Sequence, residues 1–368
     1  MARIESSRKA RQRRAFLIAS GCVSALVLFV SGAGWALTGY VNHMVGRVNA
    51  GTTPAAAGSP LNILVAGVDS RAGLTSHQEA ELHVGRVEGT ENSDTLMLVH
   101  VSPANDRVTV VSLPRDSWVN VPGHGMNKIN AAYGLGGPAL MVRTVEQNTG
   151  LTINDYVEIN FLAFVRVIDA LGGVNVCLPV GLDDPSSGVH LAAGFHHLDG
   201  ITALEYARDR HSFPLEDLAR IQDQQSLIST ALSKIISTGT LANPVRMASL
   251  LNSVLPALRV DKRLNVSALA DEMRGVTPKD VVFVTVPLGN LDYQAPDGEV
   301  AVQWDSGQAG RLFNEIRTNQ PVIKPAPAPG KSHQSGHDAK RGSGPRKTHH
   351  PAGWVPPGAR TAAQAACH

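Results

Sequence analysis

A run of about 23 residues without a charged side chain, Ala15 to Leu37, is the feature that most limits how this chain can fold. As an α-helix the run is about 34 Å long, and a bilayer core of about 30 Å needs about 20 apolar residues. Its large apolar side chains, Leu26 and Trp35 among them, cover all faces of the helix, which is not typical of a helix at the surface of a soluble domain. We therefore predict a transmembrane signal-anchor helix over residues 15–38.

The residues before this run predict its orientation. Positively charged residues mark the cytoplasmic side of a membrane helix, and residues 1–14 contain six of them: Arg3, Arg8, Lys9, Arg11, Arg13 and Arg14. We expect a single-pass protein of the cytoplasmic membrane, with a cytoplasmic basic stub and a large extracytoplasmic part. The alternative is a cleaved signal peptide, whose apolar region is normally about 7–15 residues. Small residues at 31–34 would suit cleavage, but the run is longer than that.

Composition and local sequence divide the rest of the chain into three parts. Residues 39–60 are rich in small residues and predict a tether, residues 61–320 are long enough for one large domain, and residues 321–368 predict a disordered tail rich in Pro, Gly, Lys and His. A net charge of +2 and a stub of about 14 residues argue against nucleic-acid binding. Three cysteines are too few for a disulfide framework.

Apolar runs alternate with helical patterns from residue 61 onward. The runs at 62–67, 95–101 and 108–113 read as strands, and the last two are joined by a turn sequence, 103–106, that suits a hairpin. Further strands are expected at 156–159, 174–178 and 281–286, and helices at 138–147, 161–171, 215–237 and 307–317. This mixture, with at least one hairpin, predicts an α/β fold with a layered sheet of mixed strand direction.

Four charged segments lie at the predicted strand ends or on one helix side, where an α/β fold places its functional sites. They are 67–71 after a strand, 92–95 before one, 112–116 together with 127–130, and 206–210 together with 217–225. In the last of these, Asp217, Arg220 and Gln224 are spaced by three and four residues and share one helix face. Each segment alone also fits a structural reading, in which the Asp–Arg pairs are ion pairs that tie loops together.

Together these segments contain the side chains that phosphate chemistry uses. Guanidinium groups bind phosphate oxygens in pairs. Mg²⁺ takes one or two carboxylates and completes its shell with phosphate oxygens and water. A positive clamp with a metal also stabilises the charge on a departing phosphate. Several arginines with separated aspartates therefore indicate a site for a diphosphate and a divalent cation.

The ordered motifs make the chain similar to the LytR–CpsA–Psr family of cell-wall glycopolymer ligases. The resemblance runs from about residue 61 to residue 236 and rests on these segments: NILVAGVDSR, NSDTLMLVHV, VVSLPRDSWV, NKINAAY, YVEINFLAFVRVIDALGGV, LDGITALEYARDR and the helix that reads DxxRxxxQQ. It implies an α/β/α domain with a mixed central sheet and an apolar tunnel for a polyprenyl chain. It also implies a phosphotransferase that moves a glycopolymer, such as teichoic acid or a wall polysaccharide, from a polyprenyl-pyrophosphate carrier to peptidoglycan.

The resemblance assigns roles residue by residue. Asp69 and Asp94 match the metal-binding aspartates, for Mg²⁺ or Mn²⁺, and the catalytic candidates are Asp94, Arg115 and Asp116. The pyrophosphate-binding candidates are Arg71, Arg115, Lys128, Arg208, Arg210, Arg220 and Gln224. The apolar helix at 161–171 fits a tunnel wall as well as a core helix. Asp223 stands where many relatives have a second arginine, which moves the local charge from positive to negative.

Two further functions fit the same residues. A polyprenyl-pyrophosphate phosphatase would use the same site with water in place of a sugar hydroxyl. A non-catalytic regulator that binds a wall polymer would need the membrane location but not the intact set of aspartates and arginines. The presence of Asp69, Asp94, Arg115 and Arg208 favours an enzyme.

Overall fold

The structure is a computed structural model, and it describes residues 44–56, 58–70, 93–178, 180–209, 258–266 and 276–322, with Arg360–Thr361 and single residues between these ranges. The predicted anchor, 15–38, and the predicted helix at 215–237 lie almost wholly outside them. No helix within the described ranges is long and apolar enough to cross a membrane.

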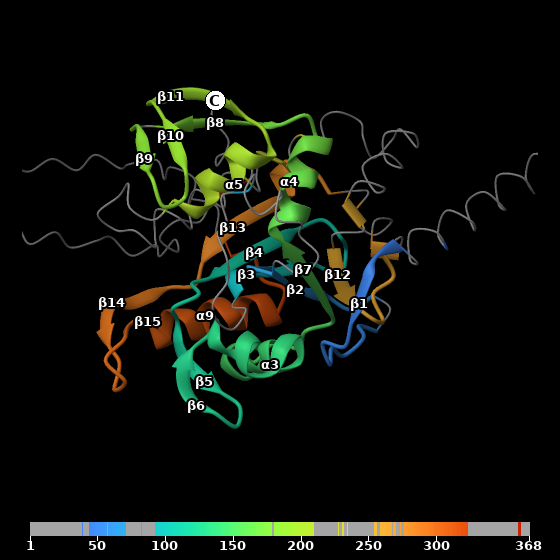
Figure 1. The fold of residues 1–368 in the computed structure, drawn as a ribbon. Coiled ribbons are helices and arrows are strands. Elements are labelled where there is room, and N and C mark those ends of the chain that lie inside the picture. The colour runs from blue at the N-terminus through green and yellow to red at the C-terminus, as the bar shows by residue number, and fades with distance from the viewer. Residues whose placement is uncertain are drawn as a thin grey trace, which may run out of the picture.

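A sheet of eight strands forms the centre of the molecule (Figure 1). Its parallel pairs are β1–β12, β7–β2 and β4–β13, and its antiparallel pairs are β12–β7, β2–β3, β3–β4 and β13–β16. The strands, in spatial order, are β1 (Gly46–Val48), β12 (Leu258–Asp261), β7 (Asp155–Asn160), β2 (Leu61–Val68), β3 (Ser93–Val101), β4 (Val108–Leu113), β13 (Val281–Thr285) and β16 (Arg360–Thr361). The prediction of a mixed sheet is confirmed, and so is the hairpin of β3 and β4.

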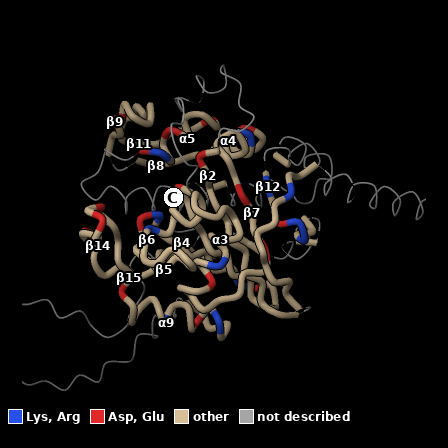
Figure 2. The backbone as a smooth tube through the Cα atoms, turned by 60° about the horizontal axis from the view of Figure 1, so that its bottom comes forward, with Lys and Arg blue, Asp and Glu red and all other residues tan. Residues whose placement is uncertain are grey.

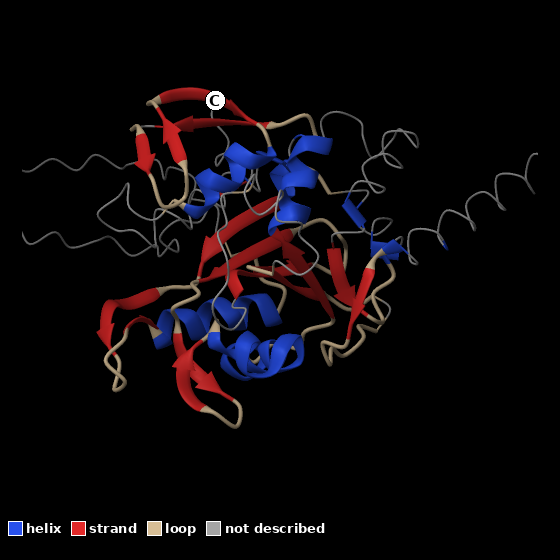
Figure 3. Ribbon diagram, in the orientation of Figure 1, coloured by secondary structure: helices blue, strands red, loops and turns tan. Residues whose placement is uncertain are grey.

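Helices cover both faces of this sheet, which makes an α/β/α arrangement (Figure 3). On one face, α3 (Ala131–Thr149) and α9 (Ser306–Arg317) pack on the inward side chains of β2, β3 and β4, and this is the largest cluster of buried apolar residues in the described part. On the other face lie α4 (Phe161–Ala170) and α5 (Gly200–Arg208). Neighbouring side chains of β2 and β3 point to opposite faces and are all buried or half-buried, as expected for a sheet that is covered on both faces.

Smaller β-elements extend the two helical layers. Beside α4 and α5 lie the antiparallel pairs β8–β11, from Val174–Leu178 and Gly194–Leu198, and β9–β10, from Leu182–Asp184 and Val189–Leu191. Beside α3 and α9 lie two hairpins: β5–β6 (Trp118–Val121 and Gly125–Lys128) and β14–β15 (Leu288–Gln294 and Val300–Trp304). The sequence did not predict either hairpin.

Part of the predicted tether is folded. Within residues 39–60, Gly46–Val48 forms β1, which pairs with β12. Val48 and Ala50 are buried in the main core, and the Ala50 amide donates to the Asp261 carboxylate at 3.0 Å. The tether prediction is wrong here, because the pairing partner of β1 lies in a distant part of the sequence and leaves no local signal.

His100, at the end of the sheet far from the strand ends discussed below, predicts a pH dependence of stability. Its Nδ1 lies 2.8 Å from Asn62 Oδ1 and its Nε2 lies 3.1 Å from Asn319 Oδ1. Burial lowers the pKa of this imidazole below its ordinary value, against the opposing effect of the Asn319 bond. The unfolded chain therefore binds more protons below about pH 6.5, and the folded state loses stability as the pH falls through that range.

We expect the free energy of unfolding from urea titrations to fall between pH 7.5 and pH 5.5, by at most about 1.4 kcal/mol per pH unit from this group. The variant His100→Gln should show a flatter dependence over the same range. Equal slopes for the native chain and the variant would contradict this assignment.

Candidate functional site

A cavity of ≈ 410 Å³ lies between the sheet and helices α4 and α5. Asp69, Asp94 and Arg208 line it at the end of the sheet where β2 ends and β3 begins and at the last residue of α5. Its walls are mainly apolar and come from the five elements β2, β3, β7, α4 and α5 and one further residue: Val65, Met97, Ile159, Phe161, Phe164, Leu204 and Leu227. A cavity of this size and character suits a ligand that has one charged end and one apolar part.

The pairing of β2 with β3 brings the two aspartates to this cavity. Asp69 directly follows β2, and Asp94 is the second residue of β3. The antiparallel register places Gly67 opposite Thr95 and Val68 opposite Ser93, with an irregularity between the two pairs. The Ser93 hydroxyl lies 3.3 Å from the Gly67 carbonyl oxygen and 3.1 Å from that of Thr95, which stabilises this irregular point.

Arg115 reaches the cavity's edge from the loop after β4. Because β4 pairs with β3, residues just after β4 lie beside residues at the start of β3. Arg115 Nη1 donates to Asp94 Oδ1 at 2.6 Å, and its Nε donates to Asp116 Oδ2 at 3.2 Å. The Arg115 carbonyl oxygen accepts the Asn130 amide at 3.1 Å, so the loop is anchored at the start of α3.

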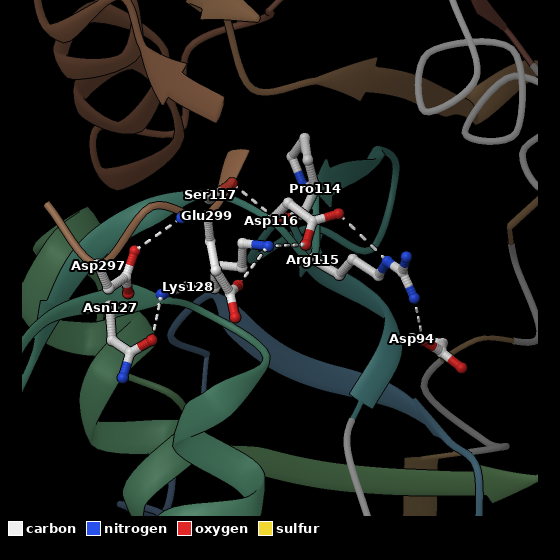
Figure 4. Close-up of polar contacts among 9 residues, drawn as sticks. All are labelled: Asp94, Pro114, Arg115, Asp116, Ser117, Asn127, Lys128, Asp297 and Glu299. Carbon is white, nitrogen blue, oxygen red and sulfur yellow. Dashed lines mark hydrogen bonds and ion pairs between the residues drawn. The ribbon is translucent and has the colours of Figure 1, made fainter. Parts of the chain in front are cut away.

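These contacts continue as a row of alternating charges, which we call the charge chain: Asp94, Arg115, Asp116, Lys128 and Glu299 (Figure 4). Lys128 Nζ lies 3.5 Å from Asp116 Oδ1 and 2.7 Å from Glu299 Oε2. Burial opposes the charge of Lys128, but the bond to Glu299 and the charge of Asp116 outweigh it and raise the pKa of this ammonium. Figure 2 shows acidic and basic positions next to one another beside β6.

The exposure of the charge chain increases away from Asp116. The side chains of Arg115, Asp116 and Lys128 are 17%, 14% and 19% exposed, whereas Asp94 is 33% and Glu299 is 62% exposed. The three inner groups are thus shielded from water, which strengthens their interactions. Asp94 and Glu299, at the two ends of the charge chain, are more exposed.

Arg208 comes to the cavity from the opposite side, in the last turn of α5. Its guanidinium carbon lies 5.3 Å from the centre of the Phe161 ring on α4, a favourable cation–π contact. The close approach of the two helices depends on Gly200, because a Cβ at this position would collide with the Val165 carbonyl oxygen. The Asp199 carboxylate caps α5 by accepting the Thr202 amide at 2.8 Å.

The structure therefore brings together all six of the predicted site residues that it describes. Asp69, Asp94 and Arg208 line one cavity, and Arg115, Asp116 and Lys128 follow from Asp94 along the charge chain. The predicted contributions of Arg71, Arg210, Arg220 and Gln224 lie outside the described residues, as does Asp223.

Sequence reasoning missed Glu299. It belongs to the turn between β14 and β15, where its amide donates to the Asp297 carboxylate at 3.1 Å. The turn itself has a sequence signal, Asp297-Gly298, which is typical of a hairpin. Nothing local indicates that the carboxylate beside this turn contacts Lys128, since the two residues belong to different hairpins.

The chemistry of the cavity's donor set fits Mg²⁺. Asp69 and Asp94 supply carboxylate oxygens at one end of the cavity, and Mg²⁺ usually takes one or two carboxylates and leaves the remaining positions to water and phosphate. No group of three or more His, Cys, Asp or Glu side chains suitable for a metal occurs among the residues with described positions. A cation held here would thus depend on a bound phosphate for part of its shell.

Comparison with known proteins agrees with the motifs. A sequence model of the LytR_cpsA_psr family matches residues 41–318. The chain is 32% identical over 354 residues to the cell wall biosynthesis protein LcpA of Corynebacterium glutamicum, which covers 86% of this chain and 68% of LcpA. It is 33% identical over 244 residues to the polyisoprenyl-teichoic acid–peptidoglycan teichoic acid transferase TagU of Oceanobacillus iheyensis, covering 61% of this chain and 71% of TagU.

The fold is also found among solved structures. The crystal structure of TagV from B. subtilis superposes with a TM-score of 0.58 at 25% sequence identity, covering 71% of this chain and 96% of TagV. This likeness confirms the predicted mixed α/β architecture.

Proposed function

The chain belongs to the LytR–CpsA–Psr family, and on this premise we propose that it transfers a glycopolymer from a polyprenyl-pyrophosphate carrier to peptidoglycan. The observation that carries the proposal is the cavity, in which apolar walls lead to Asp69, Asp94 and Arg208 beside Arg115. A lipid pyrophosphate has the matching two-part character. The relative TagU, named as a transferase of teichoic acid to peptidoglycan, supports the same reaction class.

In this proposal the polyprenyl chain lies among the apolar side chains of the cavity. Phe161 and Phe164 on α4 face Val65 and Met97 from the sheet across this space. Burial of apolar surface stabilises such a complex by about 25 cal/mol per Å², without demanding a specific shape from a flexible chain. The apolar residues of α4 thus serve both roles considered for this helix: Val165 and Ile168 are buried, while the two phenylalanines line the cavity.

The pyrophosphate would lie at the charged end of the cavity. Arg208 and Arg115 can each present two N–H groups to phosphate oxygens. Asp69 and Asp94 would hold Mg²⁺, or Mn²⁺, which supplies positive charge to the leaving phosphate when it is bound. Asp116 accepts from Arg115 and lies within ion-pair distance of Lys128, and we assign it the positioning of these two cations.

The reaction is a phosphoryl transfer. A hydroxyl oxygen of the peptidoglycan acceptor forms a bond to the phosphorus that carries the glycopolymer, and the bond between this phosphorus and the bridging oxygen breaks. The bridging oxygen leaves with the lipid phosphate, and the hydroxyl proton passes to a carboxylate. Asp69 and Asp94 both line the cavity, and we assign this role to Asp94.

The location we propose follows from the sequence. The apolar run Ala15 to Leu37 would anchor the chain in the cytoplasmic membrane, and the basic stub would keep its N-terminus inside. The catalytic domain would then stand at the outer face, beside the leaflet in which a polyprenyl carrier displays its cargo.

A bulky substitution in the cavity tests the lipid assignment. Ala207 lines the cavity on α5, and Ala207→Trp should fill part of the space that the lipid chain needs. We expect ligation from a long-chain polyprenyl donor to fall at least about tenfold, while a donor with a short, water-soluble prenyl chain reacts at nearly the native rate.

The measurement is the rate of covalent product formation with each donor, using the full chain in nanodiscs. Ala170→Trp is the matched control, because Ala170 is an exposed alanine at the end of α4. An equal loss with both donors would mean that the cavity does not hold the lipid chain.

A further inference from the structure

Two hairpins that are distant in the sequence meet next to the charge chain. Ser117, just before β5, forms a parallel bridge with Val302 on β15. The Trp304 indole N–H donates to the Ser117 hydroxyl at 2.8 Å, and the Val302 amide donates to the Asp116 carbonyl oxygen at 2.9 Å. The surface that β5–β6 and β14–β15 share is therefore fixed to the same loop that holds Arg115 and Asp116 (Figures 1 and 4).

An aromatic pair lies across this junction. The rings of Trp118 on β5 and Tyr293 on β14 have their centres 6.1 Å apart, with an angle of 49° between their planes. Both residues are partly exposed. Trp118 stands directly opposite Lys128 in the β5–β6 register, so the two side chains share one face of that hairpin.

Charged groups border this aromatic pair. Lys128 and Glu299 form the 2.7 Å ion pair that joins the two hairpins. Asp292 and Asp297 are exposed residues of β14 and of the turn that follows it. We call Trp118, Lys128, Tyr293 and Glu299 the two-hairpin surface.

This set of side chains has the chemistry of a sugar site. Aromatic rings offer flat apolar faces to the C–H groups of a pyranose. Carboxylates accept hydrogen bonds from sugar hydroxyls and amides, and an ammonium donates to ring and carbonyl oxygens. The acidic residues around the surface disfavour a polyanionic chain, so the charge here fits a neutral glycan better than an anionic wall polymer.

We propose that the two-hairpin surface binds the glycan of the acceptor and presents its hydroxyl to the site at Asp94 and Arg115. The inference rests on the proposed ligase function. The charge chain makes the connection, because it runs without a break from Asp94 at the cavity to Glu299 on this surface. The donor then occupies the cavity side of Asp94 and the acceptor the hairpin side.

Direct binding tests the proposal without turnover. The full chain in nanodiscs is titrated with chitotetraose, a neutral β-1,4-linked N-acetylglucosamine oligomer, by calorimetry, and polyglycerol phosphate serves as the anionic comparison. We expect chitotetraose to bind and polyglycerol phosphate not to bind at this surface. Trp118→Leu and Tyr293→Leu should each weaken chitotetraose binding about tenfold, whereas Trp118→Phe keeps most of it.

The matched control is Phe195→Leu, because Phe195 on β11 is an aromatic residue that is 65% exposed in the opposite helical layer. It should leave binding unchanged. A melting curve for each variant separates lost binding from lost folding, and Glu299→Gln provides a second variant that does not disturb the aromatic contact. In ligation assays the Trp118 and Tyr293 variants should raise KM for the acceptor and leave KM for the donor unchanged.

Each outcome bears on the inference. Binding of the polyanion in preference to chitotetraose, equal loss in the Phe195 control, or a raised KM for the donor alone would overturn it. Chitotetraose binding that depends on Trp118, in a chain that forms no ligation product, would support the glycan surface and count against the proposed ligase function instead.

Discussion

Arg115→Ala is expected to lower the rate of ligation about 10²–10³-fold, the usual cost of removing one preorganised group that stabilises developing charge. Arg115 is the cation of the charge chain that contacts Asp94: it bonds Asp94 at 2.6 Å and Asp116 at 3.2 Å and is only 17% exposed. Its removal takes away a phosphate-binding fork and leaves two carboxylates close together without the cation between them. The measurement is kcat/KM for covalent product with the full chain in nanodiscs.

Two further variants make this result specific. Arg143→Ala, on the exposed side of α3, removes the same charge away from the site and should keep near-native activity. Arg115→Lys keeps the charge but loses the planar fork, so we expect it to recover only a small part of the rate. Native activity in Arg115→Ala, with an intact fold, would remove Arg115 from the mechanism.

Asp94→Asn is expected to have an effect of similar size on activity and a larger one on metal binding. Asp94 borders the cavity with Asp69 and also accepts from Arg115. The amide keeps the shape of the side chain but removes the negative charge that a hard divalent cation needs. We predict at least about a hundredfold loss of ligation and a clear weakening of Mn²⁺ binding, measured by electron paramagnetic resonance in the presence of a pyrophosphate analogue.

The control for this variant is Asp106→Asn, in the turn between β3 and β4 at the far end of the sheet. It carries the same chemical change and should alter neither Mn²⁺ binding nor ligation. If Asp94→Asn bound Mn²⁺ as the native chain does, the metal assignment of Asp94 would be wrong, although Arg115 could still act on the pyrophosphate.

The central strands could be predicted because each carries its own signal. The run at 108–113 matches β4 residue for residue, and its turn with the preceding strand has the expected sequence. Arg115 and Asp116 could be placed at a strand end for the same reason. Helix α3 begins earlier than the predicted residue 138, since the chain turns through the non-helical Gly136 and Gly137 and continues. A pair of glycines such as Gly136 and Gly137 normally indicates the end of a helix, so the sequence did not indicate helical residues on both sides of them.

Contacts between distant segments could not be predicted from the sequence alone. The sequence of β1 alone is typical of a linker, and its strand conformation depends on pairing with β12. The ion pair of Lys128 with Glu299 joins two hairpins, and the sequence of neither hairpin indicates that it contacts the other. The same holds for Trp118 and Tyr293. The residues that belong to sequence motifs, such as Asp94 and Arg115, could therefore be predicted as site residues. The contacts between the two hairpins could not be predicted.

The most direct test of the proposed reaction is a product balance. The full chain in nanodiscs is given a lipid-linked glycopolymer and Mg²⁺, with or without peptidoglycan, and mass spectrometry counts polyprenyl phosphate and polymer-bearing peptidoglycan. A ligase releases one lipid phosphate for each polymer joined through a phosphodiester, and only when the acceptor is present. Lipid phosphate released at the same rate without acceptor, and with no polymer joined to peptidoglycan, would show hydrolysis and contradict the account.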